Sequence, residues 1–219
     1  MKILIAIPCY EAAPVEFCQS LMNLILYEER RCENQIDVLF MGSSLVYEAR
    51  NKLALAAISK GADAVLWVDS DMLFPEDALE QLIRHGKEFV CGQYFCRKPP
   101  FSPCVFSAAE IRVVDNGAAV EPYNELIYDQ PDELFEIAAC GFAFVFTTTE
   151  MIAKTYADNG LPFQPIGGFG EDMSFCIRAR DSGYQLWCDP NCKIGHLGKM
   201  VVNENSYLSY ANKDRGEAK

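Results

Sequence analysis

Short apolar runs alternate with helix-like segments through the first part of the chain, and this alternation restricts the possible folds more than any other feature. The runs cover residues 2–7, 38–41, 64–68 and 89–92, and the segments between them cover residues 15–27, 43–60 and 75–86. Continuous apolar strands separated by helices are typical of a parallel sheet that is buried on both faces. The order βαβαβαβ therefore predicts an α/β fold with a mostly parallel central sheet flanked by helices.

The remaining elements are expected to be smaller additions to this sheet. An Asp-Asn-Gly turn at residues 115–117 lies between two apolar segments and predicts a small antiparallel hairpin. The other expected elements are a long strand over 136–148, a helix over 149–158 capped by Thr149, a helix over 172–182 and a final strand over 185–188. No repeat or linker divides the chain, which predicts one domain over residues 1–202 followed by a polar tail over 203–219.

Composition narrows the possible functions. Half of the 219 residues are hydrophobic, which favours a globular protein with a core. The net charge of −12 argues against long-range attraction to nucleic acid or anionic lipid, so a phosphate ligand would need a local cation or a bridging metal. No apolar run approaches the roughly 18 residues of a membrane span, and the first run is too short for a signal peptide. We therefore expect a cytoplasmic protein without a transmembrane segment.

The chain contains ten cysteines, and without an export signal we expect reduced thiols rather than a disulfide framework. The closest spacings are Cys91 to Cys96 and Cys188 to Cys192. Neither matches the usual spacing of a zinc site. Whether either pair does more than pack is left open by the sequence.

Two aspartates follow directly on the third apolar run. Asp69 and Asp71 are separated by one residue, so on an extended chain both carboxylates can face one site. Ligands of open parallel sheets bind at the carboxyl ends of the strands, where this pair lies. Two carboxylates there can hold Mg²⁺ or Mn²⁺, which keeps coordination positions for substrate phosphates. The alternative is a solvated strand end that contains two aspartates by chance.

A glycine-rich segment over residues 167–170 precedes Glu171 and Asp172. Glycines allow the backbone to approach a ligand closely. Carboxylates at the start of a helix are also stabilised by the helix dipole. The pattern is therefore open to two interpretations, a general base held in a fixed place or ordinary helix capping.

Three further side chains each carry a functional and a structural interpretation. Arg50 lies at the edge of an apolar helical stripe, which predicts a partner such as a carboxylate near Asp69 or a phosphate, or else an internal salt bridge. His196 lies between two glycines after the last strand and is either a metal ligand or a loop residue. Tyr10 follows the proline that ends the first strand and could stack on a base or lie exposed.

Taken in order, these segments resemble the motifs of GT-A-fold glycosyltransferases, family 2 in particular, over residues 3–197. The segments that carry the resemblance are Ile5-Ala6-Ile7-Pro8-Cys9-Tyr10-Glu11, Ala49-Arg50-Asn51-Lys52, Leu66-Trp67-Val68-Asp69-Ser70-Asp71, Gly170-Glu171-Asp172, Arg178, Gly183-Tyr184, Asp189-Pro190 and His196. The resemblance implies a GT-A (Rossmann-like) fold and a metal-dependent transfer of a sugar from a nucleotide-sugar donor to a hydroxyl acceptor. It also implies Mn²⁺ or Mg²⁺ as the cofactor.

The same resemblance implies roles for individual residues. Donor binding falls to Pro8, Tyr10, Glu11, Arg50, Asp69 and Ser70, and metal binding to Asp69, Asp71 and His196. Asp172 matches the catalytic base of inverting members, with Glu171 beside it. Gly141 lies where the family's substrate-facing strand runs. The proline-rich loop over residues 96–103, which contains Arg97 and Lys98, is not typical of the family and is expected to shape the acceptor site.

Some features depart from the family, and other functions compete with this one. Ser174 stands where many members carry an acidic residue, and the QxxRW motif of processive members is absent. The alternatives are a catalytically degenerate nucleotide- or sugar-binding module and a sugar-phosphate nucleotidyltransferase. The second is disfavoured because residues 8–14 contain no Gly, Lys or Arg, and the absence of GxGxxG argues against a Rossmann dehydrogenase. The sugar, the base, the acceptor and the oligomeric state are not determined by these patterns.

Overall fold

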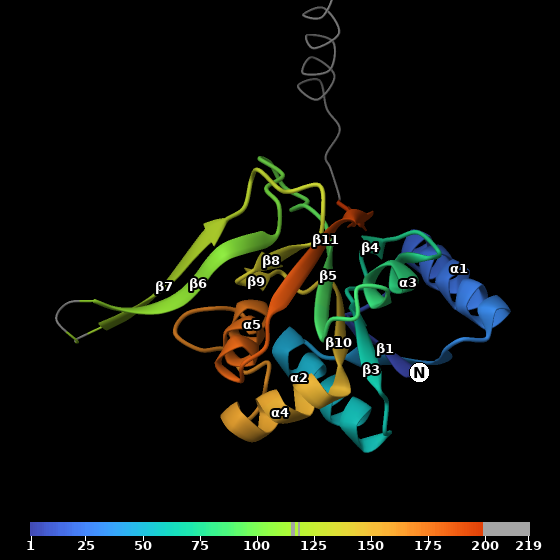
Figure 1. Ribbon diagram of the computed structural model, residues 1–219, viewed down its shortest axis with the longest axis horizontal. Helices are drawn as coiled ribbons and strands as arrows, with labels where there is room; N and C mark the ends of the chain where they lie inside the picture. The colour runs from blue at the N-terminus through green and yellow to red at the C-terminus, as the bar shows by residue number, and fades with distance from the viewer. Residues whose placement is uncertain (115–116, 118, 199–219) are drawn as a thin grey trace, which may run out of the picture.

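The computed structural model describes residues 1–114, 117 and 119–198, which are built around a seven-stranded sheet (Figure 1). In spatial order its strands are β2 (Gln35–Gly42), β1 (Lys2–Cys9), β3 (Ala64–Val68), β10 (Phe144–Thr148), β5 (Phe89–Gln93), β11 (Leu186–Lys193) and β8 (Phe135–Ile137). Strands β2, β1 and β3 pair in parallel, as do β5 and β11, whereas β10 is antiparallel to both of its neighbours and β8 is antiparallel to β11. The predicted α/β fold with a mainly parallel sheet is confirmed.

Helices cover both faces of the sheet because the side chains of its strands alternate between two apolar clusters. On β1, Ile3, Ile5 and Ile7 face one cluster, while Leu4 and Ala6 face the other. The first cluster is closed by α1 (Val15–Arg31) and α3 (Ala78–Ile83), and the second by α2 (Val46–Ser59), α4 (Thr149–Asn159) and α5 (Glu171–Asp181). Within the described part of the chain, no helix is long and apolar enough to cross a membrane.

Two small sheets complete the fold. The predicted hairpin is present as β6 (Val105–Val114) and β7 (Ala119–Leu126), joined on one side by β9 (Ala139–Cys140), and it projects from the body of the molecule (Figure 1). Of its turn, Asp115 and Asn116 lie outside the described residues. The second small sheet pairs β4 (Met72–Leu73) with β12 (Gly195–His196). The expected tail over 203–219 also lies outside the described residues, so its separation from the domain stays a prediction.

The expected single strand over 136–148 is wrong. Its residues form three strands that belong to different partners: β8 pairs with β11, β9 pairs with β6, and β10 lies between β3 and β5. The chain changes partner at Gly141, where an added Cβ would collide with the hydroxyl of Tyr94. An apolar run reports burial but not the neighbour against which each part is buried.

Several predicted helix and strand limits also shift. The helix expected over 75–86 is regular only from Ala78 to Ile83, with Asp77 at its N-cap. Thr148, rather than Thr149, caps α4, since its hydroxyl oxygen accepts a hydrogen bond of 3.3 Å from the amide of Met151. The last large strand continues beyond residue 188 to Lys193.

The cysteines are mainly part of the core. All ten are free thiols, and Cys91 and Cys188 lie opposite each other on β5 and β11 with no exposed surface. Cys140 and Cys192 are also fully buried. Buried thiols of this kind pack as small apolar side chains.

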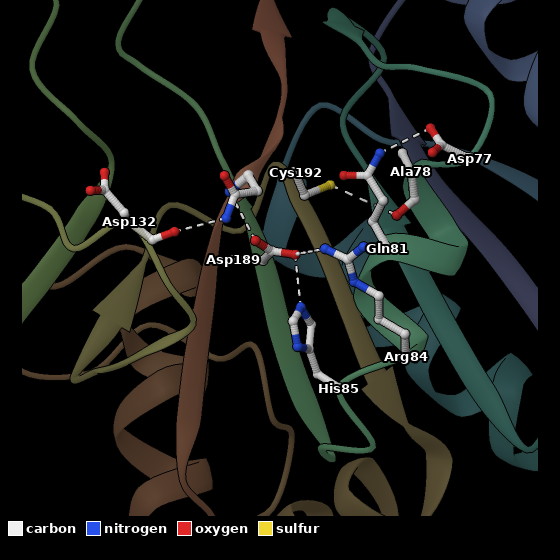
Figure 2. A network of polar contacts seen from close by, with 9 residues as sticks. Asp77, Ala78, Gln81, Arg84, His85, Asp132, Asp189 and Cys192 are labelled. Carbon is white, nitrogen blue, oxygen red and sulfur yellow. Dashed lines mark hydrogen bonds and ion pairs between the residues drawn. The ribbon is translucent and has the colours of Figure 1, made fainter.

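A buried carboxylate joins α3 to β11. Figure 2 shows Asp189 between His85 and Arg84, which follow the end of α3. One Asp189 oxygen lies 2.8 Å from His85 Nε2 and 3.3 Å from Arg84 Nη2, and the other accepts a hydrogen bond of 2.8 Å from the amide of Asn191. Burial opposes ionisation, but these partners outweigh it and hold the pKa of Asp189 below its ordinary value of 3.8. The network fixes the strand whose continuation carries His196.

Candidate functional site

A cleft of about 780 Å³ opens where three parallel strands end. Pro8 and Tyr10 come from the end of β1, Ser43 and Ser44 follow β2, and the Asp69–Asp71 segment follows β3. The remaining lining residues are Cys9, Glu11, Ala12, Ala13, Pro14, Val46, Ala49 and Arg97. Six of the residues predicted to bind the donor or the metal therefore line this one cleft together with Arg97, as expected for the carboxyl ends of an open sheet. These six are Pro8, Tyr10, Glu11, Asp69, Ser70 and Asp71.

Backbone hydrogen bonds fix the turn that carries the two aspartates. The amide of Asp69 donates to the carbonyl of Ala143 at 2.9 Å, and the amide of Met72 donates to the carbonyl of Asp69 at 3.2 Å. Met72 then pairs with His196 in the small β4–β12 sheet, and the amide of Leu197 donates to the carbonyl of Asp71 at 2.8 Å. Residues separated by more than 120 positions are thus held side by side.

His196 and Arg97 meet the same carboxylate oxygen. Oδ2 of Asp71 lies 2.5 Å from Arg97 Nη1 and 3.4 Å from His196 Nε2. The other ring nitrogen of His196, Nδ1, is 3.0 Å from the carbonyl oxygen of Phe95. A histidine that donates Nδ1–H to a carbonyl presents the lone pair of Nε2, which is the usual arrangement of a metal-ligating imidazole.

The position of Arg50 differs from the prediction. It is 2% exposed and is not among the residues that line the cleft. Its Nη2 is 2.6 Å from Oδ1 of Asp69, and its Nε is 3.8 Å from Oε1 of Glu171. Of the partners left open by the sequence, the structure contains the carboxylate near the Asp69–Asp71 turn. Arg50 therefore supports the cleft wall from behind and does not face its interior.

Arg50 also connects the cleft to the start of α5. Its guanidinium carbon lies 5.2 Å from the ring centre of Phe142 and 6.0 Å from that of Phe163, so the charge rests on aromatic faces. Nε and Nη1 have no hydrogen-bond partner among the described residues. A buried guanidinium shared by Asp69 and Glu171 holds the two acidic segments in one arrangement.

Glu171 and Asp172 form the first turn of α5, after Gly170 at the N-cap. Neither lines the 780 Å³ cleft. Oδ1 of Asp172 accepts a hydrogen bond of 2.7 Å from the amide of Met173. Burial raises the pKa of Asp172 to about 6, the hydrogen bond from Met173 opposes this, and the charge of Glu171 adds to it. A carboxylate with that pKa can be ionised near neutral pH and still accept a proton readily.

Three side chains from α2 and α5 anchor the loop that precedes α5, a role that the sequence analysis did not predict for them. Oδ1 of Asn51 accepts a hydrogen bond of 2.9 Å from the amide of Phe163. Arg178 donates to the carbonyls of Pro162 and Gln164 at 3.1 and 2.5 Å. The hydroxyl of Ser174 accepts from the amide of Ile166 and donates to the carbonyl of Gly170. These residues position the loop rather than contact the cleft, which accounts for a serine at position 174.

Gly141 was predicted to face the substrate, but it lines neither the 780 Å³ cleft nor a second cleft that adjoins it. It lies against Tyr94, whose ring in turn meets that of His196 edge to face at 6.0 Å. The structure therefore gives Gly141 a packing role, because only a hydrogen fits beside the phenol.

A second cleft of about 640 Å³ shares Pro14, Asp71 and Arg97 with the first. Its other lining residues are Glu16, Lys98, Leu197 and Gly198. Arg97 thus stands between the two clefts. Sequence reasoning expected the loop that contains Arg97 and Lys98 to shape the acceptor site, but it did not assign Ser43 or Ser44 to a site. The serines could have been found by the same rule that identified Asp69, since they follow the end of a parallel strand.

Few side chains in the cleft could hold a divalent cation. Across residues 1–114, 117 and 119–198, no group of three or more His, Cys, Asp or Glu side chains is arranged to hold a metal ion. Asp69 is engaged by the buried Arg50 and Asp71 by the half-exposed Arg97, and of the two aspartates it is Asp71 that also lies beside His196. Two protein ligands suit a cation that completes its coordination with water and substrate phosphates. The residues present fit a shared metal site of this kind.

Comparison with known proteins gives a fold. Neither a protein-family model nor a curated protein sequence matches the chain. Among solved structures, it is similar to A197 from STIV, with 16% identity, a TM-score of 0.52, and coverage of 93% of this chain and 97% of that one. It is also similar to GalNAc-T7, solved with UDP, GalNAc and Mn²⁺, with 10% identity, a TM-score of 0.58 and coverage of 96% of this chain and 47% of that one. This chain therefore has a GT-A-like α/β fold, and it corresponds to about half the length of GalNAc-T7.

Proposed function

We propose that this protein is a divalent-cation-dependent glycosyltransferase that moves a sugar from a nucleotide-sugar donor to a hydroxyl acceptor. The observation that carries the proposal is the convergence of His196 on Asp71, an aspartate that lines a cleft formed by the ends of three parallel strands. The GT-A-like fold supports the same assignment. The similarity to a protein solved with UDP, GalNAc and Mn²⁺ makes a nucleotide sugar the first ligand class to test.

In this proposal the donor lies in the 780 Å³ cleft. The exposed ring of Tyr10 stacks on the base, and Ser43, Ser44 and Ser70 supply polar groups for the ribose. The diphosphate is directed towards Asp71 and His196. A divalent cation bound there would neutralise charge that develops on the leaving diphosphate. Asp69 does not bind the cation directly in this proposal, because Arg50 holds it in place.

Asp172 is the proposed general base. As the acceptor oxygen attacks the anomeric carbon, the bond from that carbon to the diphosphate breaks, and the diphosphate leaves with the bonding electrons. The hydroxyl proton passes to the Asp172 carboxylate, for which a pKa of about 6 is well suited at neutral pH. One displacement of this kind inverts the anomeric configuration. Glu171 acts beside it by holding Arg50 and by raising the proton affinity of Asp172.

The first test is ligand-dependent thermal stability. The native protein is heated with UDP, GDP, CDP or TDP, each with and without Mn²⁺, because a ligand that binds only the folded state raises Tm. We expect one nucleotide to give a Mn²⁺-dependent increase that is lost in Asp71→Ala. Glu76→Ala is the matched control, since Glu76 is an exposed acidic residue that does not line the cleft. If no nucleotide raised Tm, with or without Mn²⁺, the proposal would be wrong.

A catalytically degenerate binding module is the second candidate, favoured by the observation that neither Glu171 nor Asp172 lines the cleft. Turnover separates the two functions. Release of the nucleoside diphosphate from its sugar nucleotide should fall by about 100-fold or more in Asp172→Asn, with ligand binding retained, if Asp172 is the base. If the native protein binds the sugar nucleotide but releases no nucleoside diphosphate from it with any of a panel of sugar acceptors, it is a binding module.

A further inference from the structure

Carboxylates outnumber cations in the lining of the donor cleft. Glu11, Asp69 and Asp71 contribute carboxylates to its lining. Among the described residues that line this cleft, Arg97 is the only cation. The chain as a whole carries a net charge of −12, so no general positive field assists an anionic ligand. A diphosphate that enters the cleft meets Arg97 as its one protein cation.

Arg97 is engaged at the position where a metal would bind. Its Nη1 is 2.5 Å from Oδ2 of Asp71, the oxygen that also faces His196 Nε2 at 3.4 Å. A cation that uses this oxygen must compete with the guanidinium, because two like charges at the same oxygen repel each other. The ion pair holds Asp71 in place and would have to open for a metal to use this oxygen.

The surroundings of Arg97 allow the guanidinium to leave Asp71 while the backbone stays in place. The loop that carries Arg97 is held by two backbone hydrogen bonds. The amide of Cys96 donates to the carbonyl of Ser102 at 2.8 Å, and the amide of Phe101 donates to the carbonyl of Lys98 at 2.9 Å. The Arg97 side chain is 51% exposed and borders both clefts. Rotation of the side chain alone can therefore redirect it, since exposed rotamers interconvert rapidly.

We propose that Arg97 is an exchanging cation: it pairs with Asp71 in the empty site, yields that oxygen to the incoming metal, and then binds the phosphate oxygens of the nucleoside diphosphate. This inference rests on the proposed function, because it assumes that the cleft takes a nucleoside diphosphate. Arginine suits the second position since its planar fork can donate two parallel hydrogen bonds to a phosphate. It adds to Asp71 and His196 a specificity residue that distinguishes diphosphates from uncharged nucleosides.

The proposal predicts effects of opposite sign on two ligands. Arg97→Gln should bind Mn²⁺ alone about threefold or more tightly than the native protein, because the competing charge is gone. In saturating Mn²⁺ the same variant should bind the nucleoside diphosphate about tenfold or more weakly, the loss expected for one charge-assisted contact. Its affinity for the matching nucleoside should be unchanged. Arg97→Lys should lie between, since it keeps the charge without the fork.

Titration calorimetry with MnCl₂ measures the affinity for Mn²⁺. Titration with the nucleotide identified by the thermal shifts then measures the affinity for the nucleoside diphosphate. Lys193→Gln is the control, because it removes one positive charge from an exposed residue that lines neither cleft, and it should change neither affinity. If Arg97→Gln bound both Mn²⁺ and the nucleoside diphosphate more weakly than the native protein, the role of Arg97 would be purely structural and the proposal would be overturned. Unchanged Mn²⁺ affinity would overturn it as well. If the native protein binds Mn²⁺ but no nucleotide, the proposed function fails, and the Mn²⁺ arm still decides whether Arg97 competes at Asp71.

Discussion

Asp172→Asn should make the folded protein more stable at pH 7.5, even though it removes the proposed base. The reason is the unfavourable environment of this carboxylate. Burial, with the charge of Glu171 as a further contribution, raises the pKa of Asp172 from 3.8 to about 6. Ionised Asp172 is therefore less favourable in the folded chain than in the unfolded chain. Asparagine avoids this cost and still offers an oxygen to the amide of Met173, which now donates to Asp172 at 2.7 Å.

The size and pH dependence of the effect follow from those two pKa values. Each pKa unit corresponds to about 1.4 kcal/mol, so ionisation of Asp172 costs the folded state at most about 3 kcal/mol. Because the folded-state pKa is the higher one, the native protein loses this stability as pH rises from about 4 to about 6, and the loss is constant above. The gain in Asp172→Asn should therefore approach 3 kcal/mol at pH 7.5 and shrink to well under about 1 kcal/mol near pH 4.

Urea unfolding of the two proteins at pH 4 and pH 7.5, in the presence of EDTA, measures this difference. The control is Asp181→Asn, a change of the same chemistry at the exposed last residue of the same helix, which should alter stability by less than about 0.5 kcal/mol. The reasoning is refuted if Asp172→Asn gains the same stability at both pH values, or if it is less stable than the native protein at pH 7.5. Either result would mean that the Asp172 carboxylate is well solvated or well paired.

Two other perturbations test the framework around the site. Asp189→Asn should lower the free energy of unfolding by about 2 kcal/mol at pH 7, because it removes the charge that His85 and Arg84 surround. Since the pKa of Asp189 is held below 3.8, its contribution is complete above that value and is lost as pH falls through the lower folded-state pKa, so the difference in urea unfolding should be smaller at pH 3 than at pH 7. Gly141→Ala should cost about 1–3 kcal/mol through its collision with Tyr94, whereas Gly42→Ala, whose nearest neighbour would be 3.8 Å away, should cost less. Adding Tyr94→Phe should recover part of the loss in thermal melts, and a Gly141→Ala protein as stable as Gly42→Ala would contradict the packing role.

The sequence predicted the site through strand ends more than through individual motifs. Asp69 and Asp71 were located correctly because an apolar run followed by carboxylates marks the carboxyl edge of a parallel sheet. The same rule placed Pro8 and Tyr10. For Arg50, the sequence predicted a charged partner and the structure supplied Asp69, but spacing could not show that the side chain lies behind the cleft wall. Orientation of a side chain depends on packing against Phe142 and Phe163, which come from distant segments.

The proximity of His196 to Asp71 was implied only by the family resemblance, and the course of residues 136–148 was not predicted. His196 reaches Asp71 through β4 and β12, strands of only two residues that carry no periodic signal. The segment 136–148 is apolar throughout most of its length, and periodicity gives the same result for one strand or three. In both cases the deciding information is the identity of the partner, which is a long-range property of the fold.

The antiparallel strand at the centre of the sheet leaves the sheet incomplete until late in synthesis. Strand β10 lies between β3 and β5, yet it is synthesised more than 50 residues after either of them. Until residue 148 has been made, both neighbours present unpaired edges towards the same gap, and open edges of this kind invite pairing with other chains. Closing the gap also requires contacts between segments far apart in sequence, which are slow to form. The amide of Asp69 donates to the carbonyl of Ala143, directly before β10, and the amide of Leu197 donates to the carbonyl of Asp71, so the aspartate turn lacks both supports until these later segments have been made.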